Sequence, residues 1–377
     1  MSFQIIDPKL KYDTTGYLSE GTFGVSTLVH VRSNEANKFV MKQIDILFDA
    51  NQYDNSQQHH QQHTQVKFLN KKLSSASILN TEKERIAKLI KLLAKLSLHE
   101  NIVYIIDCFI AKQSLSVYTI TEFCKEDSLK AKLHKLRLMK MHVQDELVFK
   151  WFIQTISALK YLHSNGILHA NIKPKNFLLA SNGERIKITD FGYLSLFSSK
   201  QQRAYYVNKL VNKNYQYLPK ETIEQHEYTH LSDIYSIGCI FFEIIFLERY
   251  NHSNEYALID LKLRCSDEHF AYLLTSMLSV NTLLRPNINN VNRFCELKSN
   301  FYFYDNTKIE SDAISKQIPA LSLLNSSNEF MPNATESLMS LISMRTDQRP
   351  PSRQKTSDNI INFEGIIVFI NEYFFQI

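Results

Sequence analysis

The stretch His169-Ala170-Asn171-Ile172-Lys173-Pro174-Lys175-Asn176 decides the fold of this chain. It contains two amide side chains, Asn171 and Asn176, and a lysine between them, Lys173. An amide oxygen is a hard ligand of the kind that Mg²⁺ accepts. A carboxamide, however, has no oxygen basic enough to take up a proton near neutral pH, as a general base must. The stretch therefore offers a metal ligand and a positive charge but no general base.

Six further stretches accompany it in a fixed order along the chain. Together with the first stretch they resemble the motifs of the protein kinase family, in which the quoted stretch is the catalytic loop. The others resemble the Gly-rich loop, the strand with the phosphate-binding lysine, the Asp-Phe-Gly and Ala-Pro-Glu motifs, and two segments of the large lobe. In chain order they are Leu18–Gly24, Phe39–Lys42, Thr189–Gly192, Tyr217–Glu221, Ser232–Gly238 and Leu284–Pro286.

The resemblance implies the fold class and the domain organisation. It predicts an α+β, bilobal protein-kinase-like fold, with a small antiparallel-sheet N-lobe that carries one regulatory helix and a large, mainly helical C-lobe. The kinase-like domain is expected over residues 12–298, with the N-lobe at 12–123 and the C-lobe at 125–298. An N-terminal extension, 1–11, precedes it, and a partly disordered tail, 299–377, follows it.

Local patterns in the sequence predict the individual elements. Residues 16–46 alternate apolar and polar side chains, which favours an antiparallel sheet. Residues 51–65 are mostly Asn, Gln and His and cannot fill a core, so a disordered insertion is predicted over 48–78. Apolar residues at helical spacing predict a helix that begins near Thr81 as its N-cap. Further strands are predicted at 102–106 and 115–123, and further helices at 146–164 and 233–246.

Composition limits the classes of function. The 377 residues are 44% hydrophobic, enough to form real cores, and the net charge of +5 is mild and spread along the chain. Such a charge gives no sign of nucleic-acid binding. The five scattered cysteines indicate neither a disulfide framework nor a zinc site. Without a signal-peptide pattern or a long apolar run, no membrane partner is expected, and a cytoplasmic (or nuclear) location is predicted.

The resemblance also implies which residues form the site. Phosphoryl transfer depends on metal ions, positive charge and alignment. The resemblance therefore predicts ATP and Mg²⁺ as ligands, with Asn176 and Asp190 on the metal. Asn171 stands at the position of the missing base, and Lys173 matches the lysine that steadies the transferred phosphate. The predicted nucleotide-binding residues are Gly21, Gly24, Lys42, Glu122, Cys124 and Leu178.

Several positions depart from the family pattern. The glutamate that pairs with the phosphate-binding lysine would fall at Leu89 or Ile90, so Lys42 is expected to lack this partner. Ala170 replaces the arginine that precedes the base and that anchors a phosphorylated activation segment. Ser26 and Val40 alter the contacts around the adenine. The residues that hold the scaffold are kept, whereas those that perform the chemistry are changed.

Two functions follow, and a third interpretation stays open. The favoured one is a pseudokinase that serves as a weak ATP-binding, scaffold or regulatory module in signalling, with protein partners of unknown identity. The alternative is an active, atypical Ser/Thr protein kinase that transfers the ATP γ-phosphate to protein hydroxyls, since a general base contributes only about 10²–10⁴-fold. A kinase domain that is decaying without a function is also compatible with the sequence.

Overall fold

The computed structural model describes residues 8–46, 76–111, 116–251, 261 and 264–306. The chain divides into two compact units, residues 1–295 and 296–377. All elements discussed below belong to the first unit, except that helix α10 (Ile288–Asn306) continues into the second. The predicted insertion falls mostly outside the described residues, and the tail beyond residue 306 falls entirely outside them.

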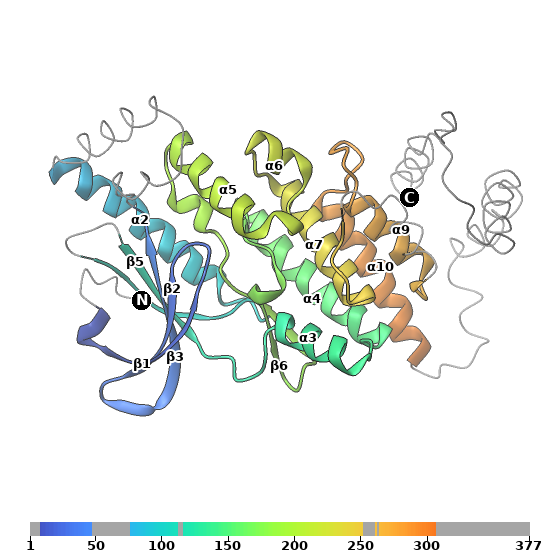
Figure 1. Ribbon diagram of the computed structural model, residues 1–377, viewed down its shortest axis with the longest axis horizontal. Coiled ribbons are helices and arrows are strands. Elements are labelled where there is room, and N and C mark those ends of the chain that lie inside the picture. Colours follow the sequence, from blue (N-terminus) through green and yellow to red (C-terminus); the bar gives the residue numbers. More distant parts are fainter. Residues whose placement is uncertain (1–7, 47–75, 112–115, 252–260, 262–263, 307–377) are drawn as a thin grey trace, which may run out of the picture. The chain divides into compact units, whose positions relative to one another are not determined.

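A five-stranded antiparallel sheet forms the N-terminal part, as the alternating sequence predicts (Figure 1). Its strand order is β1-β2-β3-β5-β4, and its longest strand, β3, lies in the centre. Three consecutive strands joined by short turns bring the Gly-rich stretch, between β1 and β2, next to the end of β3 that carries Lys42. The strands are β1 (Tyr12–Glu20), β2 (Val25–Val31), β3 (Asn34–Asp45), β4 (Ile105–Ile110) and β5 (Ser116–Glu122).

One long helix, α2 (Ala76–Leu96), packs against this sheet at β4. Ile86, Ile90 and Leu93 recur at helical spacing and are almost fully buried, which explains why this face turns inward. The predicted N-cap at Thr81 is wrong: the helix begins five residues earlier, because residues 76–80 contain no Gly or Pro to stop it.

The fourth strand also lies later than predicted, at 105–110 instead of 102–106. Ile102 and Val103 contact another part of the chain. Ile102 forms an isolated parallel bridge with Ile188, and the Val103 backbone N–H donates to the Ile188 carbonyl over 2.9 Å. Residues 102 and 103 therefore pair with Ile188, and only residues 105 and 106 of the predicted strand join the five-stranded sheet.

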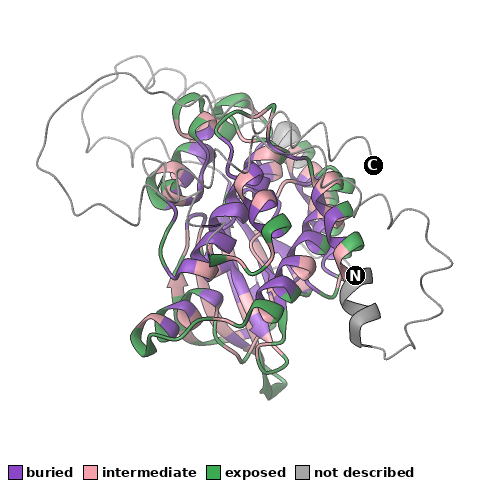
Figure 2. Cartoon of the chain, turned by 90° about the vertical axis from the view of Figure 1, so that its right-hand side faces the viewer, coloured by how far each residue is buried: buried purple, intermediate pink, exposed green. Residues whose placement is uncertain are grey.

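The rest of the first unit is mainly helical, so the fold is the expected α+β class. Helices α4 and α7 are lined with buried residues, and Figure 2 shows the buried residues in the interior of the chain. No described helix is both long and apolar enough to span a lipid bilayer. The helices are α3 (Leu129–Met139), α4 (Asp145–Ser164), α5 (Lys200–Asn214), α6 (Lys220–Gln225), α7 (His230–Phe246) and α9 (Glu268–Met277).

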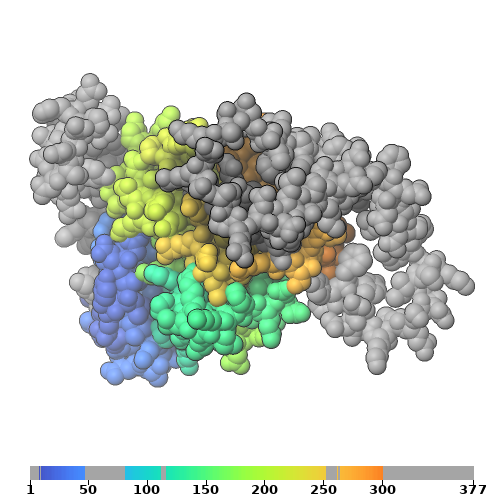
Figure 3. Space-filling model, turned by 45° about the vertical axis from the view of Figure 1, so that its right-hand side comes forward, coloured from blue at the N-terminus to red at the C-terminus, as the bar shows by residue number. Residues whose placement is uncertain are grey.

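Several short elements accompany the five-stranded sheet and the helical part of this unit. A small antiparallel sheet, β6 (Phe177–Ala180) and β7 (Arg185–Ile188), follows the 3₁₀ turn η3 (Pro174–Asn176). A second such turn, η4 (Tyr193–Leu196), precedes α5, and a third, η5 (Tyr215–Tyr217), follows it. On the face shown in Figure 3, strands β1–β3 (blue) adjoin the region of α5 (yellow-green), where Lys213 and Glu20 lie 3.8 Å apart.

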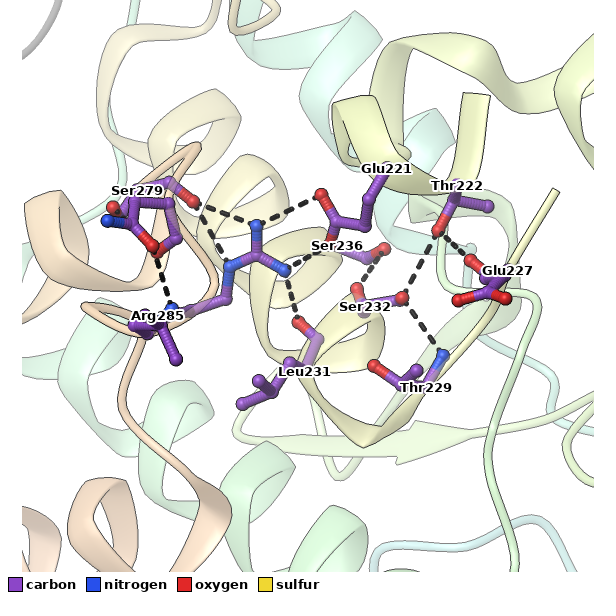
Figure 4. A network of polar contacts seen from close by, with 11 residues as sticks. Glu221, Thr222, Glu227, Thr229, Leu231, Ser232, Ser236, Ser279 and Arg285 are labelled. Atoms are coloured by element: carbon purple, nitrogen blue, oxygen red, sulfur yellow. Dashed lines mark hydrogen bonds and ion pairs between the residues drawn. The ribbon is translucent and has the colours of Figure 1, made fainter. Parts of the chain in front are cut away.

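A buried ion pair joins α6 to the loop before α10 (Figure 4). Arg285 donates from Nη1 to Glu221 Oε1 over 2.6 Å, and its side chain is 0% exposed. The same guanidinium also donates to the carbonyl groups of Leu231 and Ser279. Five hydrogen bonds to three residues, Glu221, Leu231 and Ser279, make this arginine the anchor of the segment that ends at α6.

This anchor predicts a large effect of one substitution on stability. Glu221→Gln should lower the free energy of unfolding by about 3–5 kcal/mol, because it leaves a buried guanidinium without its counter-charge. The measurement is urea unfolding. Glu224→Gln, which removes an exposed partner 3.7 Å from Lys220, is the matched control and should change stability by less than about 0.5 kcal/mol. Equal effects of the two substitutions would contradict the anchoring role.

Candidate active site

The quoted stretch is held in place by one buried carboxylate, Asp233 on α7. Its two oxygens accept hydrogen bonds from the backbone N–H groups of His169 (2.8 Å) and Ala170 (3.0 Å). They also accept from Tyr228 Oη (2.7 Å), and His163 Nε2 lies 2.8 Å away. Ala170 has a φ of 55°, a left-handed conformation that costs energy in alanine, so Asp233 holds the loop in a strained shape.

Asn171 lies at the centre of this loop and is 2% exposed. Its side-chain oxygen accepts a hydrogen bond from Asn214 Nδ2 (3.3 Å), and its backbone carbonyl accepts one from Asn176 Nδ2 (2.7 Å). Among the described residues, its own Nδ2 has no hydrogen-bond partner. An amide buried in this way can donate and accept hydrogen bonds but cannot take a proton from a hydroxyl.

Lys42 and Asp190 meet in a buried ion pair, as the sequence-based interpretation requires of residues that share one site. The Lys42 ammonium donates to Asp190 Oδ2, and the two side chains are 5% and 18% exposed. Burial alone would raise the pKa of Asp190, but the charge and hydrogen bond of Lys42 bring it below its ordinary value. Asp190 therefore stays ionised at neutral pH.

Lys173 reaches the tip of the Gly-rich stretch. Its Nζ donates to Thr22 Oγ1 over 2.9 Å and to Asn214 Oδ1 over 3.2 Å. Burial lowers the pKa of Lys173 to about 8; Asp190 opposes this shift, and the nearby charge of Lys42 adds to it. Asn214 Nδ2 also lies 3.3 Å from Thr22 Oγ1, so three segments far apart in sequence share one set of hydrogen bonds.

The two glycines of the turn, Gly21 and Gly24, let its backbone lie close to strand β3. Gly21 donates its backbone N–H to the Gly24 carbonyl (2.8 Å), and a Cβ on Gly21 would lie 3.6 Å from Lys42 Nζ. Gly24 has a φ of 155°, and a Cβ there would overlap the Gln43 carbonyl oxygen at 1.7 Å. Only glycine fits at position 24, because the turn lies directly on β3.

Phe23, one of the two residues between these glycines, packs the turn against α5. Its ring stacks on that of Tyr206 in α5, with centroids 3.8 Å apart and planes 3° from parallel. Tyr206 in turn donates to the Ala170 carbonyl over 3.2 Å. The Gly-rich turn, α5 and the quoted loop are thus packed into one unit.

The structure places the remaining predicted nucleotide-binding residues on neighbouring elements. The Glu122 carboxylate turns to the Tyr104 backbone N–H (2.8 Å) and Lys187 Nζ (2.6 Å). Cys124 is half-buried, and burial, together with the charge of Glu122, raises the pKa of its thiol to about 11. Leu178 lies in β6, bridged to Ser128. A role for Glu122, Cys124 and Leu178 in holding an adenine stays a prediction.

The predicted metal ligands fit an ion that arrives with a phosphate chain. Asn176 donates its amide N–H to the loop, which leaves its Oδ1 free to act as a ligand, and Asp190 supplies a carboxylate that is 18% exposed. In the described part of the chain, no group of three or more His, Cys, Asp or Glu residues could hold a metal by itself. Mg²⁺ commonly takes one or two protein oxygens together with substrate phosphates, so these two ligands suffice for such an ion.

Four residues of the site escape the sequence-based interpretation: Thr22, Tyr193, Asn214 and Arg85. Arg85 on α2 donates to the carbonyls of Ser195 (3.2 Å) and Leu196 (2.6 Å) and also binds Glu82. Glu82 therefore pairs with Arg85 and is not the partner of Lys42. The contacts of these residues span more than 100 positions in the chain, and no local pattern signals them.

Comparison with known proteins gives one consistent family. The profile described as "Protein kinase domain" matches residues 52–357, well over half of the chain. "Probable serine/threonine-protein kinase nek2" of Dictyostelium discoideum is 26% identical over 80% of this chain and 68% of its own length. "Serine/threonine-protein kinase Nek5" of Homo sapiens is 28% identical over 56% of this chain. "Mitogen-activated protein kinase 5" of Arabidopsis thaliana is 33% identical over 46% of it.

The chain corresponds to only part of most of these proteins. It spans about two thirds of the Dictyostelium relative, but 30% of the human one and 44% of the plant one.

The lowered pKa of Lys173 predicts how phosphate binding depends on pH. Lys173 loses its charge as the pH rises through about 8, so affinity for a nucleoside triphosphate should fall between pH 7 and pH 9.5. If binding raises the pKa by one unit, the loss is about tenfold. Titration calorimetry at several pH values measures it. Lys173→Arg should keep its affinity at pH 9.5, and Lys173→Met should bind weakly at every pH. An unchanged pH profile in Lys173→Met would contradict this role.

Proposed function

The chain belongs to the protein kinase domain family, and we propose that it is a pseudokinase: a nucleotide-binding module that transfers phosphate negligibly or not at all. The observation that carries the proposal is the environment of Asn171. An amide occupies the position of the base, it is buried, and its oxygen already accepts a hydrogen bond from Asn214.

The closed Gly-rich turn supports the same proposal. Thr22 lies within hydrogen-bonding distance of both Lys173 and Asn214, at the place where a transferred phosphate and its acceptor would have to meet. The stack of Phe23 on Tyr206 holds the turn there. A substrate hydroxyl could reach Asn171 only after these contacts open, and it would then find no base.

Nucleotide binding is supported by what the site keeps. Kinase domains generally use ATP and Mg²⁺, and Lys42, Lys173, Asn176 and Asp190 all belong to one connected site. We infer weak ATP binding with Mg²⁺, because no glutamate in the described part of the chain pairs with Lys42 and both Asp190 and Lys173 are already engaged by protein groups. A signalling role as a scaffold for protein partners, and a cytoplasmic or nuclear location, stay predictions.

An active Ser/Thr kinase remains the second candidate, and one observation favours it. The ion pair between Lys42 and Asp190 is in place, and Lys173, which is part of the catalytic loop, reaches Thr22 of the Gly-rich turn. The relatives are named as serine/threonine kinases. Positioning and charge alone sustain part of the rate when a general base is missing.

Restoring the base separates the two candidates. Asn171→Asp should raise phosphotransfer to a generic Ser/Thr substrate by roughly tenfold or less, far below the 10²–10⁴-fold of a positioned base, because Thr22 and Asn214 still cover the loop. Radiolabelled ATP with purified protein measures the rate, and Lys42→Met gives the background. Robust transfer by the unmodified chain that Lys42→Met abolishes would instead establish the active kinase.

The metal role of Asp190 predicts a loss that depends on magnesium. Asp190→Asn should weaken ATP binding in Mg²⁺ by about tenfold, equal to 1.4 kcal/mol, and should make the affinities with and without Mg²⁺ similar. Fluorescence titration in Mg²⁺ and in EDTA measures both. Asp127→Asn, which removes an exposed partner of Lys135, is the control and should change neither. If Asp190→Asn kept the full effect of Mg²⁺, Asp190 would not be a metal ligand.

A further inference from the structure

Among the residues that the structure describes, Lys42 has two partners, and one of them is an aromatic ring. Its ammonium pairs with Asp190 and lies 5.0 Å from the centroid of the Tyr193 ring, within the range of a cation–π interaction. Tyr193 Oη also lies 3.4 Å from Asp190 Oδ1. Tyr193 therefore contacts both members of the ion pair.

A buried ammonium needs such partners, and none of the carboxylates described in α2 pairs with Lys42. The two positions at which the family glutamate would fall carry Leu89 and Ile90, which pack into the hydrophobic core. Glu82 binds Arg85 instead. Since Lys42 is 4% exposed, water cannot replace the missing carboxylate.

We propose that Tyr193 is the positioning residue of Lys42 and takes over the role of the α2 carboxylate. The ring faces the ammonium, and the hydroxyl donates to the opposite oxygen of Asp190, so the lysine is held between a carboxylate and an aromatic face. The direction in which Lys42 points then depends on η4 and not on a charge from α2. This inference rests on the proposed nucleotide binding only for its functional consequence.

The structure holds Tyr193 firmly enough for this role. Its neighbour Gly192, with a φ of 75°, lies so close to Leu93 and Ile167 that a Cβ there would be 2.6 Å from a Leu93 methyl group. Arg85 binds the carbonyls of Ser195 and Leu196, the last two residues of η4. Burial and the charge of Asp190 raise the pKa of Tyr193 well above its ordinary value, so its hydroxyl remains a neutral donor.

The first test needs no nucleotide. Acetic anhydride modifies exposed amines, and mass spectrometry of the full chain gives the labelling rate of Lys42 relative to Lys187, which binds Glu122 elsewhere. Tyr193→Leu should speed labelling of Lys42 about threefold or more, as expected for loss of a desolvated cation–π contact. Tyr193→Phe keeps the ring and should stay within about twofold of the wild type. Equal rates in all three proteins would overturn the proposal.

A second substitution guards against misfolding. Met fills irregular apolar space, so Tyr193→Met should fold if Tyr193→Leu does not, and it should expose Lys42 in the same way. Faster labelling of Lys42 in Tyr193→Phe to the level of Tyr193→Met would show that the ring is not what holds the lysine, and would also overturn the proposal.

The third test asks whether α2 can take the role back. Leu89 lies one turn before Leu93, which contacts Gly192, so a carboxylate at position 89 projects from the face of α2 nearest to η4. Leu89→Glu should not improve ATP affinity in the wild type, where Tyr193 holds Lys42. In the Tyr193→Leu background it should recover at least half of the lost affinity, a non-additive result. Strictly additive effects would contradict the proposal.

The outcomes separate this inference from the proposed function. If the wild type binds no ATP, the proposed nucleotide binding fails, and the labelling rates still decide the role of Tyr193. If ATP binds equally well to the wild type and Tyr193→Leu while Lys42 labelling is also unchanged, the role of Tyr193 fails and nucleotide binding stands.

Discussion

The site depends on the buried carboxylate of Asp233. Burial alone would raise its pKa, but the hydrogen bond and charge of His163 lower it below the ordinary value, so the group remains ionised. As an anion it can accept from four donors at once, and two of these are the backbone N–H groups that shape the loop. Without it, those N–H groups would be buried and unpaired, and the left-handed conformation of Ala170 would lose its main support.

The contacts between the loop, α5 and the Gly-rich turn build on this fixed loop. Tyr206 binds the Ala170 carbonyl and stacks on Phe23, and Asn214 binds Asn171 and approaches Thr22. The Gly-rich turn is thus positioned from the helical side of the chain as well as from its own sheet. The residues that hold this framework are intact, whereas the base itself is an amide. Under the proposed pseudokinase function, the scaffold for binding is kept without a base, because binding and chemistry depend on different side chains.

The sequence predicts those parts of the fold that depend on short-range patterns. Alternation over residues 16–46 predicts strands β1–β3, and the resemblance to the kinase family implies that Lys42 and Asp190 share one site. The sequence does not predict where α2 begins, because residues 76–80 contain no Gly or Pro that would mark the first turn. Nor does it predict Tyr193 or Thr22 as site residues. Thr22 acts through Lys173, 151 positions away, and Tyr193 of η4 acts through a lysine on strand β3.

The shared hydrogen bonds of Thr22, Lys173 and Asn214 have a consequence for ligand affinity. A ligand that needs this space binds only those molecules in which the turn has opened, which is conformational selection. The measured dissociation constant is then the intrinsic one divided by the open fraction, so an open population of about one in a hundred weakens binding about a hundredfold. Any partner that binds α5 and keeps the turn open would increase the affinity for the ligand without contacting it.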